Sequence, residues 1–434
     1  MSQSNPVNKA AAANSLVGIL VGLSFALYVY RISVGGVSLT LLRLTVFALA
    51  VSLLLDIVLK GRRVLSAYFA LTGGVTILVL LNAFWYFGLD NYPVAQREIG
   101  SHFINLATLL VLVAWIRTER QLNQLLNGYL VGAIVALFIG FFAFLFGEIP
   151  FEGLLREFGL SHLEGQMYTN TGDAFTRLTG SFQDPNFFGV YLLTVIVISL
   201  WMFRFCGKSG LYLLLAAVSV VALLLTLSRT AYVGLFVFGG LSVLWMKSNY
   251  RLFVLSFGVA TLIICSILLA VFSDELVERI FDASSAYERL GFIFSAVDAF
   301  VKSPFFGGGP GAIVDEATGI ATAHLMYLSV LAKFGIFGAM AYFFFVFFPL
   351  LKISVSAGGF LRKYRLLIIS LYVPLFFMYF FYDFLFFLEF QYFVFSIGYV
   401  VVFSTFSRAR LESSNKINCD PRALADNCSV AGVR

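Results

Sequence analysis

Apolar runs of about 20 residues recur along the chain, and they restrict what it can fold into. The hydrocarbon core of a bilayer is spanned by about 20 apolar residues in a helix. Such runs lie at 15–30, 37–59, 67–88, 101–116, 126–147, 185–203, 211–227, 230–246, 251–272, 323–350, 366–382 and 385–406. The last two form one stretch, which we divide at Asp383 because it is too long for a single span. The pattern predicts an all-α integral membrane protein with about twelve transmembrane helices.

The composition excludes other classes of protein. Hydrophobic residues make up 60% of the chain and charged residues only 12%. In an average soluble domain, about 45–50% of the residues are apolar and about 25% are charged. Ordinary soluble, disordered, collagen-like and disulfide-rich folds are therefore excluded. The cysteines, which include Cys206, show no CxxC spacing that would favour a metal site.

The distribution of charge predicts the orientation. With both termini in the cytoplasm, most of the 29 Lys and Arg residues fall in cytoplasmic loops, while most of the 23 acidic residues fall outside. This is the positive-inside pattern of membrane proteins. The net charge of +6 is thereby explained without a nucleic-acid partner.

These boundaries predict a cytoplasmic tail at 1–14, a transmembrane domain at 15–406 and a second cytoplasmic tail at 407–434. Two outer loops are large, 148–184 and 273–322, the second lying between spans nine and ten. The cytoplasmic loops are too short for a catalytic domain, and the Gly-rich run at 307–311 lacks the Lys and Ser or Thr of a phosphate-binding loop. We therefore expect the protein to act within the membrane or at its outer face.

The second outer loop contains a predicted amphipathic helix. Ser285 and Glu288 fit a capping box, and apolar residues follow at steps of three and four. The apolar residues are Leu290, Ile293, Phe294, Val297, Phe300 and Val301. Such a helix is expected to lie on the membrane surface.

Four arginines on the outer side oppose the general charge bias. Arg229 lies in a tight turn between two spans, Arg289 in the amphipathic helix, Arg177 just before span six and Arg97 after span three. A planar, permanently charged guanidinium suits phosphate oxygens, so these residues are candidates for binding a lipid-linked diphosphate. The alternative is a surface ion pair or a side chain that anchors its helix at the interface.

Three other residues are candidates for proton transfer or charge pairing. His324 lies where the second outer loop re-enters the membrane, and an imidazole can take a proton from a sugar hydroxyl near neutral pH. Asp383 and Glu389 lie in an aromatic segment near the outer face, where they could act on an acceptor or pair with arginines. Structural roles at a helix end or in an aromatic turn are the alternatives. The three scattered histidines predict no metal site.

Three segments in this order resemble the O-antigen ligase and O-antigen polymerase superfamily of bacterial membrane glycosyltransferases. The resemblance covers roughly residues 170–345. The segments are 177–186 (RLTGSFQDPN), 227–234 (LSRTAYVG), and Arg289 followed by SPFFGGGPG at 303–311 and HLMYL at 324–328, ahead of FGIFG at 334–338. At the position where the family often has His-Asn, this chain has His324-Leu325, which leaves the histidine but removes an orienting Asn.

The resemblance implies transfer of a glycan from undecaprenyl diphosphate to an acceptor glycan at the periplasmic face of a bacterial inner membrane. It implies no nucleotide sugar, cofactor or metal. Carried over to this chain, Arg229 and Arg289 would hold the diphosphate and His324 would activate the acceptor hydroxyl. Arg177 is a further candidate for the diphosphate because of its guanidinium. A base aimed at the acceptor opposite a diphosphate leaving group predicts inversion at the anomeric carbon.

Several functions stay open at this point. A polymerase would build O-antigen, capsule or exopolysaccharide, whereas a ligase would transfer the glycan to lipid A–core during lipopolysaccharide biosynthesis. A flippase or transporter would be expected to place charges through mid-membrane spans and to show internal repeats, which this sequence lacks. Besides the bilayer and the two glycans, a chain-length regulator is an expected partner of a polymerase.

Overall fold

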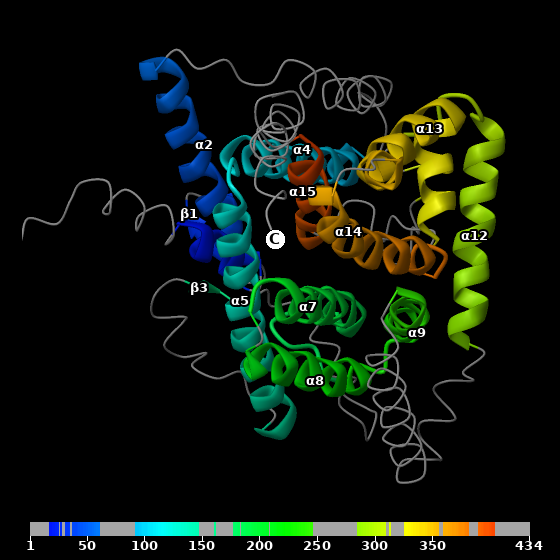
Figure 1. Ribbon diagram of the computed structural model, residues 1–434. Coiled ribbons are helices and arrows are strands. Elements are labelled where there is room, and N and C mark those ends of the chain that lie inside the picture. The colour runs from blue at the N-terminus through cyan, green and yellow to red at the C-terminus, as the bar shows by residue number, and fades with distance from the viewer. Residues whose placement is uncertain are drawn as a thin grey trace, which may run out of the picture.

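The computed structural model shows a mostly helical protein. It describes residues 17–25, 27, 31–34, 37–60, 92–146, 160–161, 177–182, 184–207, 209–245, 284–309, 312–313, 325–355, 359–381 and 389–403. The helices are α2 (Leu41–Lys60), α4 (Tyr92–Trp115), α5 (Glu119–Phe146), α7 (Pro185–Phe205), α8 (Gly210–Leu225), α9 (Arg229–Trp245), α12 (Ser284–Lys302), α13 (Met326–Val355), α14 (Gly359–Met378) and α15 (Glu389–Phe403). Figure 1 shows their arrangement.

Among the described residues, three helices are long and apolar enough to cross a membrane. They are α5, α7 and the Met326–Ser354 part of α13. Shorter apolar helices occupy Leu41–Leu55, Phe103–Trp115, α8 and Gln391–Phe403. The structure is thus consistent with a membrane protein. The predicted spans 67–88 and 251–272 and the two tails, 1–14 and 407–434, lie outside the described residues, so the count of twelve spans stays a prediction.

A small sheet departs from the all-α prediction. Strands β1 (Arg31–Val34), β2 (Val37–Thr40) and β3 (Leu160–Ser161) form an antiparallel sheet of order β2-β1-β3. β1 pairs with β2 so that Arg31 faces Thr40 and Val34 faces Val37. Two glycines separate the strands in the sequence, a composition that favours tight hairpins. The predicted span 37–59 was therefore wrong at its start, because residues 37–40 form β2 and the helix begins at Leu41.

Helix α7 lies at the centre of the bundle. Its first turn is fixed by Asp184, which accepts a hydrogen bond from Asn186 N (2.7 Å), and by Pro185 at the first helical position. The helix is apolar on all sides, and 78% of its spanning window is buried. It packs against α5, α8, α9 and α14 (Figure 1).

Aromatic residues join α7 to its neighbours in the core. The ring of Tyr129 on α5 stacks on Phe393 of α15, with centroids 4.1 Å apart. Its hydroxyl bonds to Thr194 Oγ1 on α7 at 2.6 Å. The buried polar groups of this contact are therefore satisfied within the protein.

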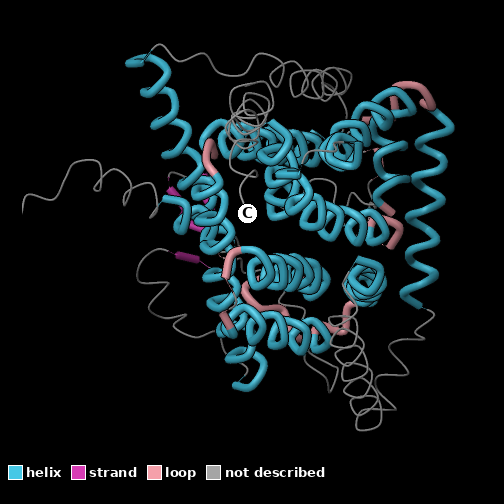
Figure 2. Tube along the Cα trace, in the orientation of Figure 1, coloured by secondary structure: helices cyan, strands magenta, loops and turns pink. Residues whose placement is uncertain are grey.

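Helix α13 is broken at Gly335, which has φ 65° and ψ −173°. The loop after α12 folds back against this break (Figure 2) and supplies hydrogen bonds to the backbone groups that the break leaves unpaired. The bonds are Gly308 N to Ala332 O (2.7 Å), Gly309 N to Lys333 O (2.8 Å), Ile336 N to Pro304 O (2.9 Å) and Phe337 N to Phe305 O (3.3 Å). Non-helical backbone is tolerated at membrane depth when protein satisfies it in this way.

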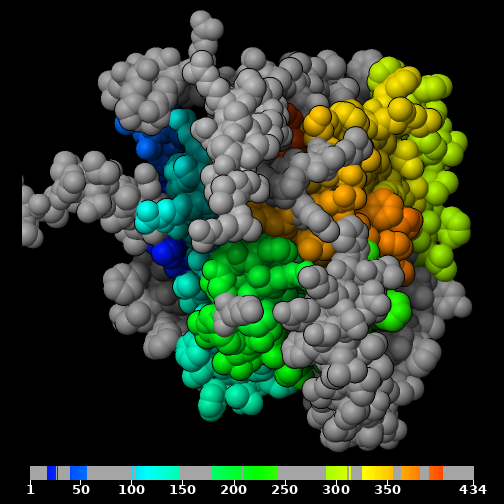
Figure 3. Space-filling view, in the orientation of Figure 1, coloured from blue at the N-terminus to red at the C-terminus, as the bar shows by residue number. Residues whose placement is uncertain are grey.

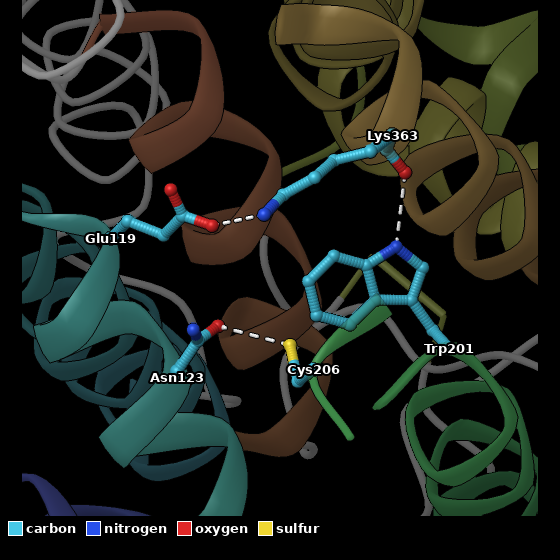
Figure 4. A network of polar contacts seen from close by, with 5 residues as sticks. All are labelled: Glu119, Asn123, Trp201, Cys206 and Lys363. Atoms are coloured by element: carbon cyan, nitrogen blue, oxygen red, sulfur yellow. Dashed lines mark hydrogen bonds and ion pairs between the residues drawn. The ribbon is translucent and has the colours of Figure 1, made fainter. Parts of the chain in front are cut away.

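A polar network ties α5, α7 and α14 together near one end of the bundle (Figure 4). Lys363 forms an ion pair with Glu119, and its backbone carbonyl accepts a hydrogen bond from Trp201 Nε1 (3.0 Å). Cys206 Sγ contacts Asn123 Oδ1 at 3.7 Å beside them. These contacts hold the start of α5, the start of α14 and the end of α7 next to one another.

Candidate functional site

The segment that precedes α7 lies against the turn between α8 and α9. Leu178 N donates a hydrogen bond to Leu225 O (3.1 Å). The Arg177 guanidinium donates from Nε to Thr226 O (2.9 Å) and from Nη2 to Leu227 O (3.3 Å). The last carbonyls of a helix have no partner within the helix, and here the guanidinium reaches carbonyls at the end of α8. Two of the sequence motifs thus meet in space.

The turn itself is strained and capped. Leu227 has φ 51°, in the left-handed region that is uncommon for residues other than glycine. Ser228 Oγ accepts a hydrogen bond from Ala231 N (3.2 Å), which caps the start of α9. Tyr232 OH donates to Leu224 O (2.6 Å) and closes the turn from its other side. Arg229 is consequently held as the first residue of α9.

The exposed side chain of Arg229 lies where the backbone already favours an anion. The N-terminus of a helix carries a partial positive charge and directs N–H groups outward. An exposed guanidinium at the same point adds a full charge. The structure therefore brings Arg177 and Arg229 to one turn, and the exposed member, Arg229, is the better placed to contact a diphosphate.

The predicted outer-loop helix corresponds to α12. Ala296 and Phe300 on one side of α12 pack with Leu328 and Ala332 of α13. Phe294 remains 69% exposed on another side. Figure 3 shows the surfaces of α12 and α13 together along one edge of the molecule. The apolar residues of α12 are thus divided between a packing face and an exposed face that suits lipid.

Arg289 lies in the first half of α12, but its side chain is outside the described part of the structure. The same holds for Arg97 in α4 and for Glu389, the first residue of α15. His324 and Asp383 lie outside the described residues altogether. Their predicted roles stay predictions.

The chain segments next to His324 and Asp383 do meet. Met326 N, two residues after His324, donates a hydrogen bond to Tyr379 O (3.1 Å), four residues before Asp383. Tyr327 OH donates to Phe376 O (2.9 Å) and adds a second link between α13 and α14. The start of α13 is therefore fixed against the end of α14.

Two buried polar residues near this junction were missed by the sequence analysis. Lys333 is fully buried in α13 next to the helix break, and Gln391 of α15 is buried with its amide bonded to the Tyr379 hydroxyl. Gln391 also approaches Met326 Sδ at 4.0 Å. A lysine inside the predicted span 323–350 was a usable signal, because charged groups at membrane depth are costly and tend to be functional.

Within the described ranges, no group of three or more His, Cys, Asp or Glu side chains could hold a metal ion. The arrangement instead offers an exposed arginine at a helix N-terminus. Such a position is suited to an anionic group.

The described part of the chain is a mostly helical structure consistent with a membrane protein, with the exposed Arg229 at the start of α9. The family described as O-antigen ligase matches residues 211–343, which include the turn, α9, α12 and the first half of α13. This match confirms the resemblance of the chain to the O-antigen ligase and polymerase superfamily. No curated protein matches the chain.

Proposed function

We propose that this protein is a polysaccharide polymerase that transfers a glycan from undecaprenyl diphosphate to an acceptor sugar hydroxyl. The observation that carries the proposal is the position of Arg229, exposed at the N-terminus of α9 within the region that matches the O-antigen ligase family. The helix terminus and the guanidinium together favour a diphosphate. The reaction takes place at the periplasmic face of a bacterial inner membrane, with both termini in the cytoplasm.

In the proposed reaction, His324 accepts the proton of the acceptor hydroxyl. The oxygen attacks the anomeric carbon as the bond from that carbon to the diphosphate oxygen breaks. The electron pair of that bond leaves with the lipid diphosphate, whose added charge Arg229 and Arg289 stabilise. Attack opposite the leaving group inverts the anomeric centre. Asp383 and Glu389 remain candidates for contacts with the acceptor.

We propose that Arg177 holds the turn before α9 and does not bind the diphosphate directly. Its two hydrogen bonds to the carbonyls of Thr226 and Leu227 hold the turn from which Arg229 begins. We therefore assign Arg177 to positioning, since its Nε and Nη2 groups already bond the backbone.

A ligase is the second candidate, because the matching family is described as O-antigen ligase. A ligase would use the same donor and the same arginines but would transfer the glycan to lipid A–core. The two functions differ only in the acceptor. A chain-length regulator remains an expected partner of the polymerase alone.

The deciding experiment uses the purified protein in nanodiscs with a repeat unit linked to undecaprenyl diphosphate. Lipid A–core is present in half of the samples, and neither nucleotide sugar nor metal is added. Product size is followed by gel and mass spectrometry. A ladder without lipid A–core identifies a polymerase, whereas transfer only in its presence identifies a ligase.

Variants test the assigned residues in the same assay. His324→Ala is expected to lower the rate by about 10²–10⁴-fold, as for loss of a general base. Arg229→Gln and Arg289→Gln are expected to lower it by about 10²–10³-fold, as for loss of a group that stabilises developing charge. Arg120→Gln, an exposed arginine of α5, is the control. Transfer that survives His324→Ala would remove the base assignment and direct attention to Asp383 and Glu389.

A further inference from the structure

A crevice lies between α7, α9 and α14, away from the proposed diphosphate site. Its walls include Leu200, Trp201 and Arg204 of α7, Phe238 and Ser242 of α9, and Ser370 of α14. The enclosed space is about 70 Å³ and is partly open to the surroundings. It can hold a short stretch of a lipid acyl chain, whose remainder would lie along the surface of the protein.

Small side chains account for the space. Ser242 and Ser370 stand where α9 and α14 would otherwise fill the gap with larger residues. The remaining walls are mostly apolar, which suits hydrocarbon.

Two basic residues, Arg204 of α7 and Lys363 of α14, lie at the edge of the crevice. Arg204 lies in the last turn of α7, is exposed, and has its guanidinium 5.4 Å from the ring centroid of Phe205. Lys363, near the start of α14, lies 5.9 Å from the centre of the Trp201 ring, which lines the same crevice (Figure 4). The end of the bundle that carries these two residues is the one predicted to face the cytoplasm.

The crevice is separate from the site proposed for catalysis. Arg229 begins α9, whereas Ser242 lies 13 residues later on the same helix. At a rise of about 1.5 Å per residue, the two positions are about 20 Å apart along α9, roughly two thirds of a bilayer core. A ligand that contacts Arg204 therefore does not occupy the diphosphate site.

We propose that this crevice binds an anionic phospholipid of the cytoplasmic leaflet. The apolar walls take part of an acyl chain, and Arg204 binds the lipid phosphate, for which a guanidinium is suited. Basic pockets between helices on the cytoplasmic side of membrane proteins bind anionic lipid head groups. A phospholipid seated between α9 and α14 would bridge two helices that border α7.

Trp201 provides the readout, because bromine on a lipid acyl chain quenches tryptophan fluorescence at short range. We would use a full-length variant in which Trp85, Trp115 and Trp245 are Phe, so that Trp201 is the only tryptophan. The probes are brominated phosphatidylglycerol and brominated phosphatidylcholine, titrated into the protein in detergent. We expect phosphatidylglycerol to quench at about five-fold lower concentration, the preference expected for one arginine near an anionic lipid.

Two further variants test the charge of Arg204 and the space of the crevice separately. Arg204→Gln is expected to remove the five-fold preference and leave quenching by phosphatidylcholine unchanged. Ser242→Phe is expected to weaken quenching by both lipids, because the added ring fills the crevice. Arg120→Gln, which removes an exposed charge of α5 outside the crevice, is expected to change neither. Gel filtration checks that each variant is folded.

Other results would overturn the proposal. Equal quenching by the two lipids would show that no head group is selected. A preference that persists in Arg204→Gln, or is lost in Arg120→Gln, would place the selecting charge elsewhere. Displacement of phosphatidylglycerol by inorganic phosphate alone would identify a phosphate site without a lipid. Displacement by undecaprenyl phosphate at lower concentration than by unlabelled phosphatidylglycerol would assign the crevice to the polyprenyl substrate.

Discussion

Arg177 donates a hydrogen bond from Nε to the carbonyl oxygen of Thr226 at 2.9 Å, across 49 residues of sequence. With the second bond to Leu227 O, this contact fixes the end of α8 and the start of α9 to the segment that leads into α7. Arg229 is presented by the turn that these bonds hold. The contact therefore connects the packing of the central helix with the geometry of the proposed diphosphate site.

Arg177→Lys is expected to destabilise the protein although the charge is kept. A lysine ammonium lacks the planar set of donors that reaches two successive carbonyls. Loss of hydrogen bonds from a charged donor that is partly exposed is expected to cost about 1–3 kcal/mol. Thermal unfolding of the purified protein measures the change, with Arg120→Lys as the matched control. An equal Tm for the two variants would contradict the role given to Arg177.

Gly335→Ala is expected to destabilise the broken helix α13. An added Cβ would overlap the carbonyl of Phe305, and the backbone conformation at Gly335, φ 65° and ψ −173°, costs a non-glycine residue about 1–3 kcal/mol by itself. Gly239→Ala is the control, because its Cβ would meet nothing within 4 Å in a regular helix. We expect Tm to fall for Gly335→Ala and to stay level or rise for Gly239→Ala. A lower Tm for Gly239→Ala than for Gly335→Ala would show that the stability of α13 does not require the break at Gly335.

The ion pair of Glu119 and Lys363 is expected to contribute little net stability. The two side chains are 27% and 26% exposed, so solvent screens their attraction. A double-mutant cycle with Glu119→Gln and Lys363→Met measures the coupling by denaturant unfolding. We expect a coupling of about 0.5–1 kcal/mol, and a value several times larger would mean that the pair acts as a buried one.

The thiol of Cys206 is expected to react slowly with alkylating reagents at neutral pH. Desolvation by neighbouring atoms raises the pKa of this thiol, the Lys363 charge opposes the rise, and the Glu119 charge adds to it. Because only the thiolate reacts, a raised pKa means less reactive thiol at a given pH. The rate of modification by iodoacetamide is therefore expected to increase at higher pH than for free cysteine.

Charge variants test how Glu119 and Lys363 each change the pKa of the Cys206 thiol. In a protein with Cys265, Cys419 and Cys428 replaced by Ser, Glu119→Gln is expected to lower the pKa of Cys206 and speed alkylation at pH 8. Lys363→Met is expected to raise the pKa and slow the reaction. Peptide mass spectrometry at timed intervals measures both rates. Opposite changes would show that the two charges do not act on this thiol.

The sequence located the helices well, because their signals are local. The predicted span 185–203 coincides with α7, whose start is set by Asp184 and Pro185 and whose sides are apolar throughout. The capping box predicted at Ser285 and Glu288 lies in the first turns of α12, which begins at Ser284. The order of the motifs was also sufficient for the family resemblance, which the match over residues 211–343 supports.

The sequence did not predict the sheet at 31–40, the break at Gly335 or the contacts of Arg177. A run of apolar and small residues such as 31–40 suits a strand or a membrane helix equally, and its pairing with Leu160–Ser161 depends on distant residues. The unusual backbone at Gly335 exists because the loop at 304–309 satisfies the open hydrogen bonds.

By itself, the sequence predicted a helical membrane protein with arginines suited to phosphate, since hydrophobic length, helix caps and side-chain charge are properties of local segments. Only the tertiary structure decided that Arg177 holds the turn of Arg229, and that Arg204 borders an apolar crevice. Contacts of this kind join residues far apart in the chain. They exist only when the packed helices bring those residues within hydrogen-bonding or van der Waals distance.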